Sequence, residues 1–148
     1  MLRISKLTDY GIVLLVHFAR EEDGASLNAR EMASAAGLPL PVVSKMLKSL
    51  AGAELLHSQR GSRGGYQLAR KPSEVSVAEV IEALEGPIAL MNCVAGPGHC
   101  DQESLCGLRT PWQRINRVVQ QTLRAVTLAE LAADAEPRTG REPQLLHP

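Results

Sequence analysis

Three cysteines lie close together in the second half of the chain. Cys93, Cys100 and Cys106 fall within fourteen residues, and a Gly-Pro-Gly run at 96–98 allows the loop between the first two to bend. Three soft thiolates that converge on one centre suit an iron-sulfur cluster and also suit zinc. Spacing alone does not choose between these groups, because paired CxxC motifs are missing and no fourth ligand is obvious nearby. The cysteines therefore predict a metal-binding loop.

Other interpretations of the cysteines remain open. Cys93 can be a buried small hydrophobic residue, while Cys100 and Cys106 can be a redox-active thiol pair. An odd number of cysteines disfavours a closed disulfide framework. The four histidines have no recognisable relation to a nucleophilic cysteine, so we predict no enzyme and no small-molecule substrate. A thiol oxidoreductase is the weakest alternative, since no CxxC motif supports it.

The composition is that of a globular protein without a membrane segment. The chain has 148 residues, of which 45% are hydrophobic, and no apolar run approaches the ~18 residues that a membrane span requires. Its first residues run directly into a patterned segment without the small-residue cleavage site of a signal peptide. We therefore expect a cytoplasmic protein with no membrane partner.

Positive charge is concentrated in one segment, although the formal net charge is zero. Between Pro41 and Lys71 six basic residues accompany one acidic residue, Glu54, whereas acidic residues outnumber basic ones from Pro72 onward. A local basic field of this kind is typical of a nucleic-acid contact, and an ordinary solvated face is the alternative.

Two predicted helices precede the basic segment. Apolar spacing predicts a first helix over Thr8 to Glu22, capped by Thr8 or Asp9. Its expected core stripe consists of Ile12, Leu15, Val16 and Ala19. Asn28 and Glu31 form a capping-box pattern for a second helix through Ala36, which Gly37 closes.

A third helix and a hairpin complete the first half. Pro39 and Pro41 lead into a helix whose core face should hold Val43, Met46, Leu47 and Leu50. A strand at 55–59, a sharp turn at 60–65 and a return strand at 66–69 form the hairpin. A helix fits the major groove and a thin glycine-rich wing reaches the backbone or minor groove. The predicted fold is therefore mainly α, with a winged helix-turn-helix at residues 1–75 that binds double-stranded DNA. The candidate DNA-binding residues are Pro41, Ser44, Lys45, Lys48, Arg60, Arg63 and Gly64.

Residues 76–134 should hold the cysteine loop and the dimerisation helices. Capping-box patterns at Ser76–Glu79 and Thr127–Glu130 predict two short helices, the first of which packs on the winged domain. Its expected apolar face consists of Val77, Val80, Ile81 and Leu84. The polar, proline-containing tail at 135–148 is expected to be disordered.

A long helix should open at Thr110-Pro111. Hydrophobic residues recur along it at alternating spacings of four and three, as in a seam that packs on a partner helix. The seam consists of Leu108, Trp112, Ile115, Val119, Thr122 and Val126. Because two-fold operators match two-fold proteins, we expect a homodimer, with packing inside one chain as the alternative.

Up to about Ala133 the chain resembles the IscR/NsrR superfamily of iron-sulfur winged-helix transcriptional regulators (the Rrf2 type). The resemblance rests on Ile4–Gly11, Arg60–Tyr66, Ala83–Pro87 and the cysteine loop followed by Trp112. Within it, Leu84–Leu90 and Trp112–Asn116 look most like the branch that regulates the SUF iron-sulfur assembly operon.

The resemblance implies a homodimer that carries one [2Fe-2S] or [4Fe-4S] cluster per subunit and whose DNA affinity depends on that cluster. Cys93, Cys100 and Cys106 match the cysteine ligands of the family. IscR-like members have a histidine at the position of Arg109, so their ligand set is not reproduced here. NsrR-like members use an aspartate of the partner's first helix, and Asp9 matches that position.

Asp9 is therefore the predicted fourth ligand, and a helix N-terminal acid is the alternative interpretation. His99, Glu103 and Glu85 are the next candidates. Arg60 matches the wing arginine that enters the minor groove in IscR-like proteins. The function that follows is a cluster-controlled regulator of iron-sulfur assembly genes. A cluster-free repressor that senses oxidants through its cysteines and a zinc-stabilised DNA-binding protein remain as alternatives.

Overall fold

The computed structural model describes residues 4–22, 24–61, 64–96, 98, 99, 101 and 106–135. Within these ranges the chain is mainly helical, as predicted, with one two-stranded antiparallel sheet. The α-helices are α1 (Lys6–Arg20), α2 (Ala29–Ala36), α3 (Leu40–Gly52), α4 (Val77–Glu85), α5 (Asn92–Ala95), α6 (Arg109–Ala125) and α7 (Leu128–Asp134). The remaining elements are the strands β1 (Leu56–Gln59) and β2 (Gly65–Leu68) and the 3-10 helix η1 (Pro72–Glu74).

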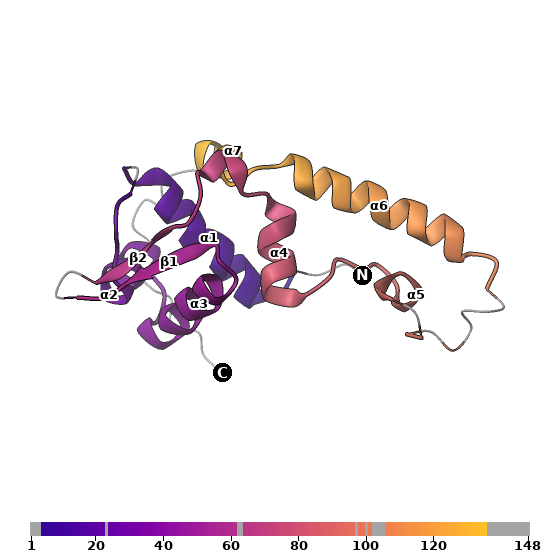
Figure 1. Ribbon diagram of the computed structural model, residues 1–148, viewed down its shortest axis with the longest axis horizontal. Helices are drawn as coiled ribbons and strands as arrows, with labels where there is room; N and C mark the ends of the chain where they lie inside the picture. Colours follow the sequence, from indigo (N-terminus) through magenta and orange to yellow (C-terminus); the bar gives the residue numbers. More distant parts are fainter. Residues whose placement is uncertain are drawn as a thin grey trace.

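The elements form a rounded body and a projecting arm (Figure 1). Helices α1, α2, α3 and α7 and the hairpin make up the body, α4 lies at its side, and α6 extends away with α5 beneath it. The predicted tail lies outside the described residues, apart from Ala135. No described helix combines the length and the apolar character that crossing a membrane requires.

Helix α1 begins earlier than the sequence predicted. Ser5 caps it by accepting a hydrogen bond from Thr8 N at 3.2 Å, so the prediction of Thr8 or Asp9 as the cap was wrong. Thr8 is instead fully buried, and its hydroxyl donates to Glu85 Oε1 at 2.5 Å. The start of α1 is thus fixed by a residue 77 positions away, which local spacing does not reveal.

The buried face of α1 also differs from the predicted stripe. Leu15 is buried as expected, whereas Ile12, Val16 and Ala19 are only partly buried against the core. The fully covered residues are Thr8, Gly11, Leu14, Leu15 and Phe18. Several elements pack around α1, namely α2, α3, α4 and α7, so its core face is rotated toward them.

Helices α2 and α3 form as the sequence indicates. The capping box of Asn28 and Glu31 opens α2, and Gly37 closes it in the left-handed conformation with φ 64°. The predicted core face of α3 is confirmed, because Val43, Met46, Leu47 and Leu50 are all buried. Together with α1 these side chains form the main hydrophobic core.

The predicted hairpin is confirmed. Leu56 pairs with Leu68, and Gln59 pairs with Gly65. Tyr66 is also paired with Leu27, since each residue donates its N–H to the other's carbonyl at 2.9 Å. A Cβ at Gly65 would lie 2.8 Å from Leu27 O, so only glycine fits where the hairpin meets the body. This contact sets the direction in which the wing leaves the body.

Helices α4 and α7 connect the body to the arm. The predicted capping boxes at Ser76–Glu79 and Thr127–Glu130 are both formed. Val77 N donates to Val126 O at 2.9 Å and Leu128 N donates to Val75 O at 2.8 Å, so the end of α6 is paired with the start of α4. α7 then packs on α1, which α4 also contacts. Of the predicted apolar face of α4, Val80 and Leu84 pack in the main core, whereas Val77 and Ile81 belong to a second cluster.

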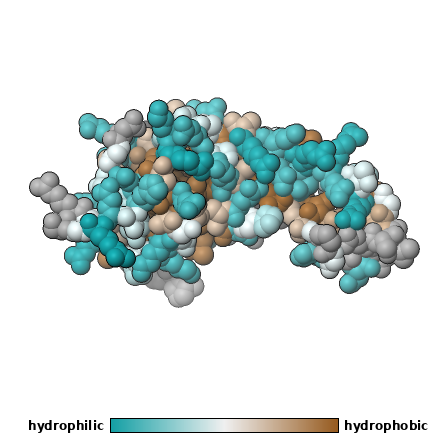
Figure 2. All heavy atoms as spheres, viewed as in Figure 1, coloured by the Kyte–Doolittle hydropathy of each residue, from teal (hydrophilic) through white to brown (hydrophobic). Residues whose placement is uncertain are grey.

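Helix α4 also packs on a second side, where Ala78 is buried although it lies outside the predicted apolar face. Ala78 and Ile81 form a small separate core with Ile88, against which Leu123 of α6 packs. Hydrophobic side chains further along the arm stay exposed: Leu108 is 61% exposed, Ile115 47% and Val118 59%. In Figure 2 hydrophilic residues cover the outer edge of the arm, with a hydrophobic patch beneath them.

Candidate functional site

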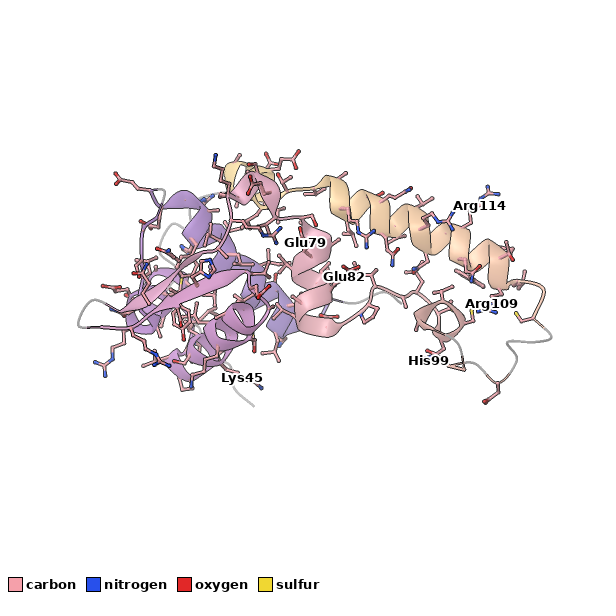
Figure 3. All side chains as sticks on the ribbon, viewed as in Figure 1. Lys45, Glu79, Glu82, His99, Arg109 and Arg114 are labelled. Atoms are coloured by element: carbon pink, nitrogen blue, oxygen red, sulfur yellow. The ribbon has the colours of Figure 1, made fainter. Side chains whose placement is uncertain are left out.

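One face of α3 presents the residues predicted to contact DNA. Pro41, Lys45 and Lys48 are exposed and Ser44 is half-buried, while the opposite face of the helix lies in the core. Figure 3 shows Lys45 pointing away from the body. Since the inward side chains fix the rotation of α3, the two lysines are held on its outer surface.

The base of the wing lies on the same body as α3. Arg60 is exposed directly after β1, which packs against α3. A Cβ at Gly64 would lie 2.7 Å from Gln59 O and 2.9 Å from Gly61 O, so the turn requires glycine at this position. Arg63 lies outside the described residues. We use the name basic surface for the exposed lysines of α3 together with Arg60.

Two of the three cysteines lie in the arm, one in α5 and one just before α6. Cys93 is in α5 and only 7% exposed, whereas Cys106 is half-buried three residues before α6. Neither thiol is in a disulfide bond. Because α5 packs on α6, the two ends of the loop are held on one scaffold. Cys100 and Glu103 lie outside the described residues.

The described part of the loop supplies side chains of the type that soft metals prefer. Among the described residues no group of three His, Cys, Asp or Glu side chains comes together, so the described part of the loop supplies two thiols. Thiolates are the usual ligands of iron-sulfur clusters and structural zinc, and the burial of Cys93 shields its sulfur from water.

The candidates for a fourth ligand have different surroundings. Asp9 is exposed in the first turn of α1, on the body, and is not grouped with the cysteines of its own chain. His99 is exposed, with its ring 3.2 Å from the position of a Cβ on Gly96. Figure 3 shows His99 beside α5 and Arg109 at the start of α6.

Glu85 is already engaged in holding the fold. Its Oε1 accepts hydrogen bonds from the Thr8 hydroxyl and, at 2.7 Å, from Ser5 N. The hydrogen bond from Thr8, followed by that from Ser5 N, holds the pKa of this carboxyl below its ordinary value of 4.5. The carboxylate therefore fastens the end of α4 to the start of α1.

The structure reveals two polar residues of α6, bonded to the segment that leads into α5, that the sequence analysis missed. Asn116 is the one buried residue of α6 and hydrogen-bonds the backbone at Ile88 and Leu90. Gln120, one turn further, also donates to Ile88 O. The only signal in the sequence was a polar residue directly after the seam position Ile115, on a helix rich in polar residues.

Helix α4 contacts both the arm and the body, which carries the basic surface. It packs on α1 and α3 on one side and on α6 on the other. Glu82 of α4 pairs with Arg124 of α6 at 3.2 Å, and Figure 3 shows Glu82 facing the arm. α4 therefore lies in contact with both the arm and the helices of the body, including α3.

Comparison with known proteins agrees with this arrangement. The family model Rrf2, described as "Iron-dependent Transcriptional regulator", matches residues 4–134. A putative HTH-type transcriptional regulator of Mycobacterium tuberculosis is 29% identical over 137 residues, which cover 92% of this chain and 84% of that protein.

Two solved structures share the fold over nearly the whole chain. CymR, the global cysteine regulator of B. subtilis, superposes with a TM-score of 0.72 at 26% identity, covering 92% of this chain and 100% of that one. T. potens IscR superposes with a TM-score of 0.68 at 26% identity, and the match covers 95% of this chain and 93% of that one. The named relatives are transcriptional regulators and not enzymes, as the sequence predicted.

Proposed function

This chain belongs to the Rrf2 family of transcriptional regulators, and we propose that it binds operator DNA as a homodimer whose affinity is set by an iron-sulfur cluster. The genes for iron-sulfur cluster assembly, in particular a SUF-type operon, are the proposed targets. The observation that carries the proposal is the position of α4, which packs on the body with the basic surface and on the arm with the cysteine loop.

The basic surface supports DNA binding. Lys45 and Lys48 are exposed on one face of α3, and Arg60 is exposed at the base of the wing. Lysine and arginine side chains on a recognition helix and wing contact phosphates and set the register, while base edges are read in the grooves. With Ser44 directly before Lys45 on this face, few bidentate base readers are present, so phosphate contacts and groove shape should carry much of the affinity.

The exposed hydrophobic residues of the arm support a homodimer. Leu108, at the cap of α6, and Ile115 and Val118 within it are about half exposed or more in the single chain. Burying them against the same helix of a second copy would remove apolar surface from water and place two recognition helices in two half-sites.

Cys93, Cys100 and Cys106 would hold the cluster, with Asp9 of the second copy completing the set. The bound cluster would supply a link between the loop and the partner's body that is broken by oxidants or by loss of iron. In each chain the loop is followed by α6, and Leu123 and Arg124 fasten α6 to α4. Since half-sites are about one helical turn of DNA apart, a small rotation of α4 would change how well both copies of α3 fit.

The proposal is tested with protein purified without oxygen. Its visible spectrum and its iron and sulfide content are measured, followed by operator binding before and after removal of the cluster. A brown protein with matching iron and sulfide and an operator affinity that changes on cluster loss is expected. A colourless protein that cannot be reconstituted contradicts the cluster, and equal affinity of both forms contradicts its control of DNA binding.

The free thiols favour a second candidate, a cluster-free regulator that senses oxidants. Cys93 in α5 and Cys106, three residues before α6, are not bonded to each other, and the chain is as similar to the B. subtilis cysteine regulator as to IscR. This candidate predicts a colourless protein whose operator affinity changes with a peroxide and returns with a thiol reductant. Replacing each cysteine in turn by serine identifies the thiols that sense the oxidant.

A further inference from the structure

Two carboxamide side chains hold the segment between α4 and α5 against α6. Asn116 Nδ2 donates to Ile88 O at 3.0 Å, and Asn116 Oδ1 accepts from Leu90 N at 2.9 Å. Gln120 Nε2, one turn further along α6, donates to the same Ile88 O at 2.9 Å. We call these three contacts the carboxamide clamp.

The burial of Asn116 is unusual for its helix. Asn116 is 6% exposed, whereas the neighbouring Ile115 is 47% and Val118 59% exposed. Burying an amide costs free energy unless its donor and its acceptor are both hydrogen-bonded, which the backbone of residues 88–90 achieves here. The side chain pairs with that backbone much as a neighbouring strand would. A hydrophobic residue could fill the same space, but it could not pair with this backbone.

The clamp connects the two described cysteines. Leu90 precedes Cys93 by three residues, and Cys106 precedes the start of α6 by three. Asn116 lies about two helical turns into α6, which is rigid over that length. The backbone that leads into Cys93 is therefore tied to the helix into which Cys106 leads.

We propose that Asn116 is a positioning residue that sets where Cys93 lies relative to Cys106, with Gln120 as its support. The expected effect of Asn116 on how tightly a metal group is bound rests on the proposed function. Side chains that orient metal ligands without touching the metal typically change metal affinity about 10- to 100-fold when they are replaced. The clamp itself is a property of the polypeptide and is testable without any metal.

The first test measures the thiols alone. The full-length reduced protein is treated with iodoacetamide, and the alkylation of Cys93 and Cys106 is followed by peptide mass spectrometry. Asn116→Leu removes both hydrogen-bonding functions at similar size, and Gln120→Leu removes one donor. Gln121→Leu is the matched control, since Gln121 is an exposed carboxamide on the same helix.

Asn116→Leu should speed alkylation of the buried Cys93 by about tenfold or more, because loss of the clamp lets the segment open locally. Gln120→Leu should give a smaller increase and Gln121→Leu none. The ratio of the Cys93 rate to the Cys106 rate separates the clamp from general unfolding, which would expose both thiols. An unchanged ratio in Asn116→Leu overturns the proposal.

The second test measures the loaded protein. The visible absorption of each variant is followed under a fixed chelator concentration, and Asn116→Leu should lose it about tenfold faster than Gln121→Leu. Equal rates overturn the positioning role. If Asn116→Leu makes Cys93 reactive but the unsubstituted protein takes up no cluster, the clamp stands and the proposed function fails. If Asn116→Leu does not fold, Gln120→Leu, which removes a single donor to Ile88 O, carries the test, and an unchanged ratio of the Cys93 rate to the Cys106 rate in it overturns the proposal.

Discussion

At the scale of single residues, two carboxylates near the start of α1 have different tasks. Glu85 accepts hydrogen bonds from Thr8 and Ser5 and so holds α4 on α1. Asp9, one residue after Thr8, is exposed. The acid already engaged in the fold is therefore the poorer candidate for a ligand, and Asp9 remains the predicted fourth ligand.

Replacing Asp9 by alanine should leave the fold intact and make the cluster labile. Loss of one ligand should speed the decay of the visible absorption under chelator by roughly tenfold or more. Glu22→Ala, just beyond the other end of α1, is the charge-matched control. Should the cluster of Asp9→Ala decay like that of the control, Asp9 would be a helix N-terminal acid worth ~0.3–1 kcal/mol of stability.

Replacing Arg60 by alanine should weaken operator binding roughly tenfold, or about 1.4 kcal/mol, because an exposed cation at the wing base is lost. The slope of the logarithm of the binding constant against the logarithm of salt concentration should also become shallower by about one, because one phosphate contact is lost. Fluorescence anisotropy with operator DNA at several salt concentrations measures both quantities. Arg117→Ala, on the exposed side of α6, is expected to bind normally. Equal affinities of the two variants for every sequence tested would remove the wing from the interface.

At the scale of elements, glutamates at helix starts carry local stability. Glu79 accepts hydrogen bonds from Ser76 and, at 2.7 Å, from Arg70. Burial raises the pKa of Glu79, but the Ser76 and Arg70 contacts together outweigh it and leave the pKa below 4.5. At Glu130 the backbone and side-chain hydrogen bonds of Thr127 likewise lower the pKa. Both carboxylates stabilise the fold in their charged form.

The free energy of unfolding should therefore fall as the pH drops below about 4.5, because a lowered carboxyl pKa stabilises the fold above that value and loses its effect as the group is protonated. Glu79→Gln should cost ~0.3–1.5 kcal/mol at neutral pH and less in acid, since its partner contacts depend on the charge. Urea unfolding of the cluster-free protein at several pH values measures this difference. Glu74→Gln is the control, and a cost for Glu79→Gln that stays constant with pH would contradict the charge-dependent role.

At the scale of the whole molecule, the arm leaves the body with its hydrophobic side chains exposed. Ile115→Glu should shift the protein toward the monomer at micromolar concentration, because a charge in the seam would be buried without a partner. Sedimentation velocity measures the shift, and operator affinity should fall with it, since one copy reaches a single half-site. Gln121→Glu, mostly outside the seam, is expected to sediment like the unsubstituted protein. A monomeric unsubstituted protein would contradict the homodimer.

The sequence by itself determined the features that depend on neighbouring residues. The capping boxes at Asn28, Ser76 and Thr127, the core face of α3 and the hairpin were all predicted, because helix caps, helical periodicity and turns involve contacts a few residues apart. The three cysteines and the exposed lysines of α3 were likewise visible as patterns.

Only the tertiary structure decided the contacts between distant segments. The start of α1 depends on Glu85, the second face of α4 depends on α6, and the burial of Asn116 depends on a segment 26 and 28 residues earlier. A polar residue on a helix is ordinarily expected to face water, and only the chain packed against it shows that its amide is needed inside. Such contacts arise because folding brings remote backbone groups together, and their partners cannot be identified from local spacing.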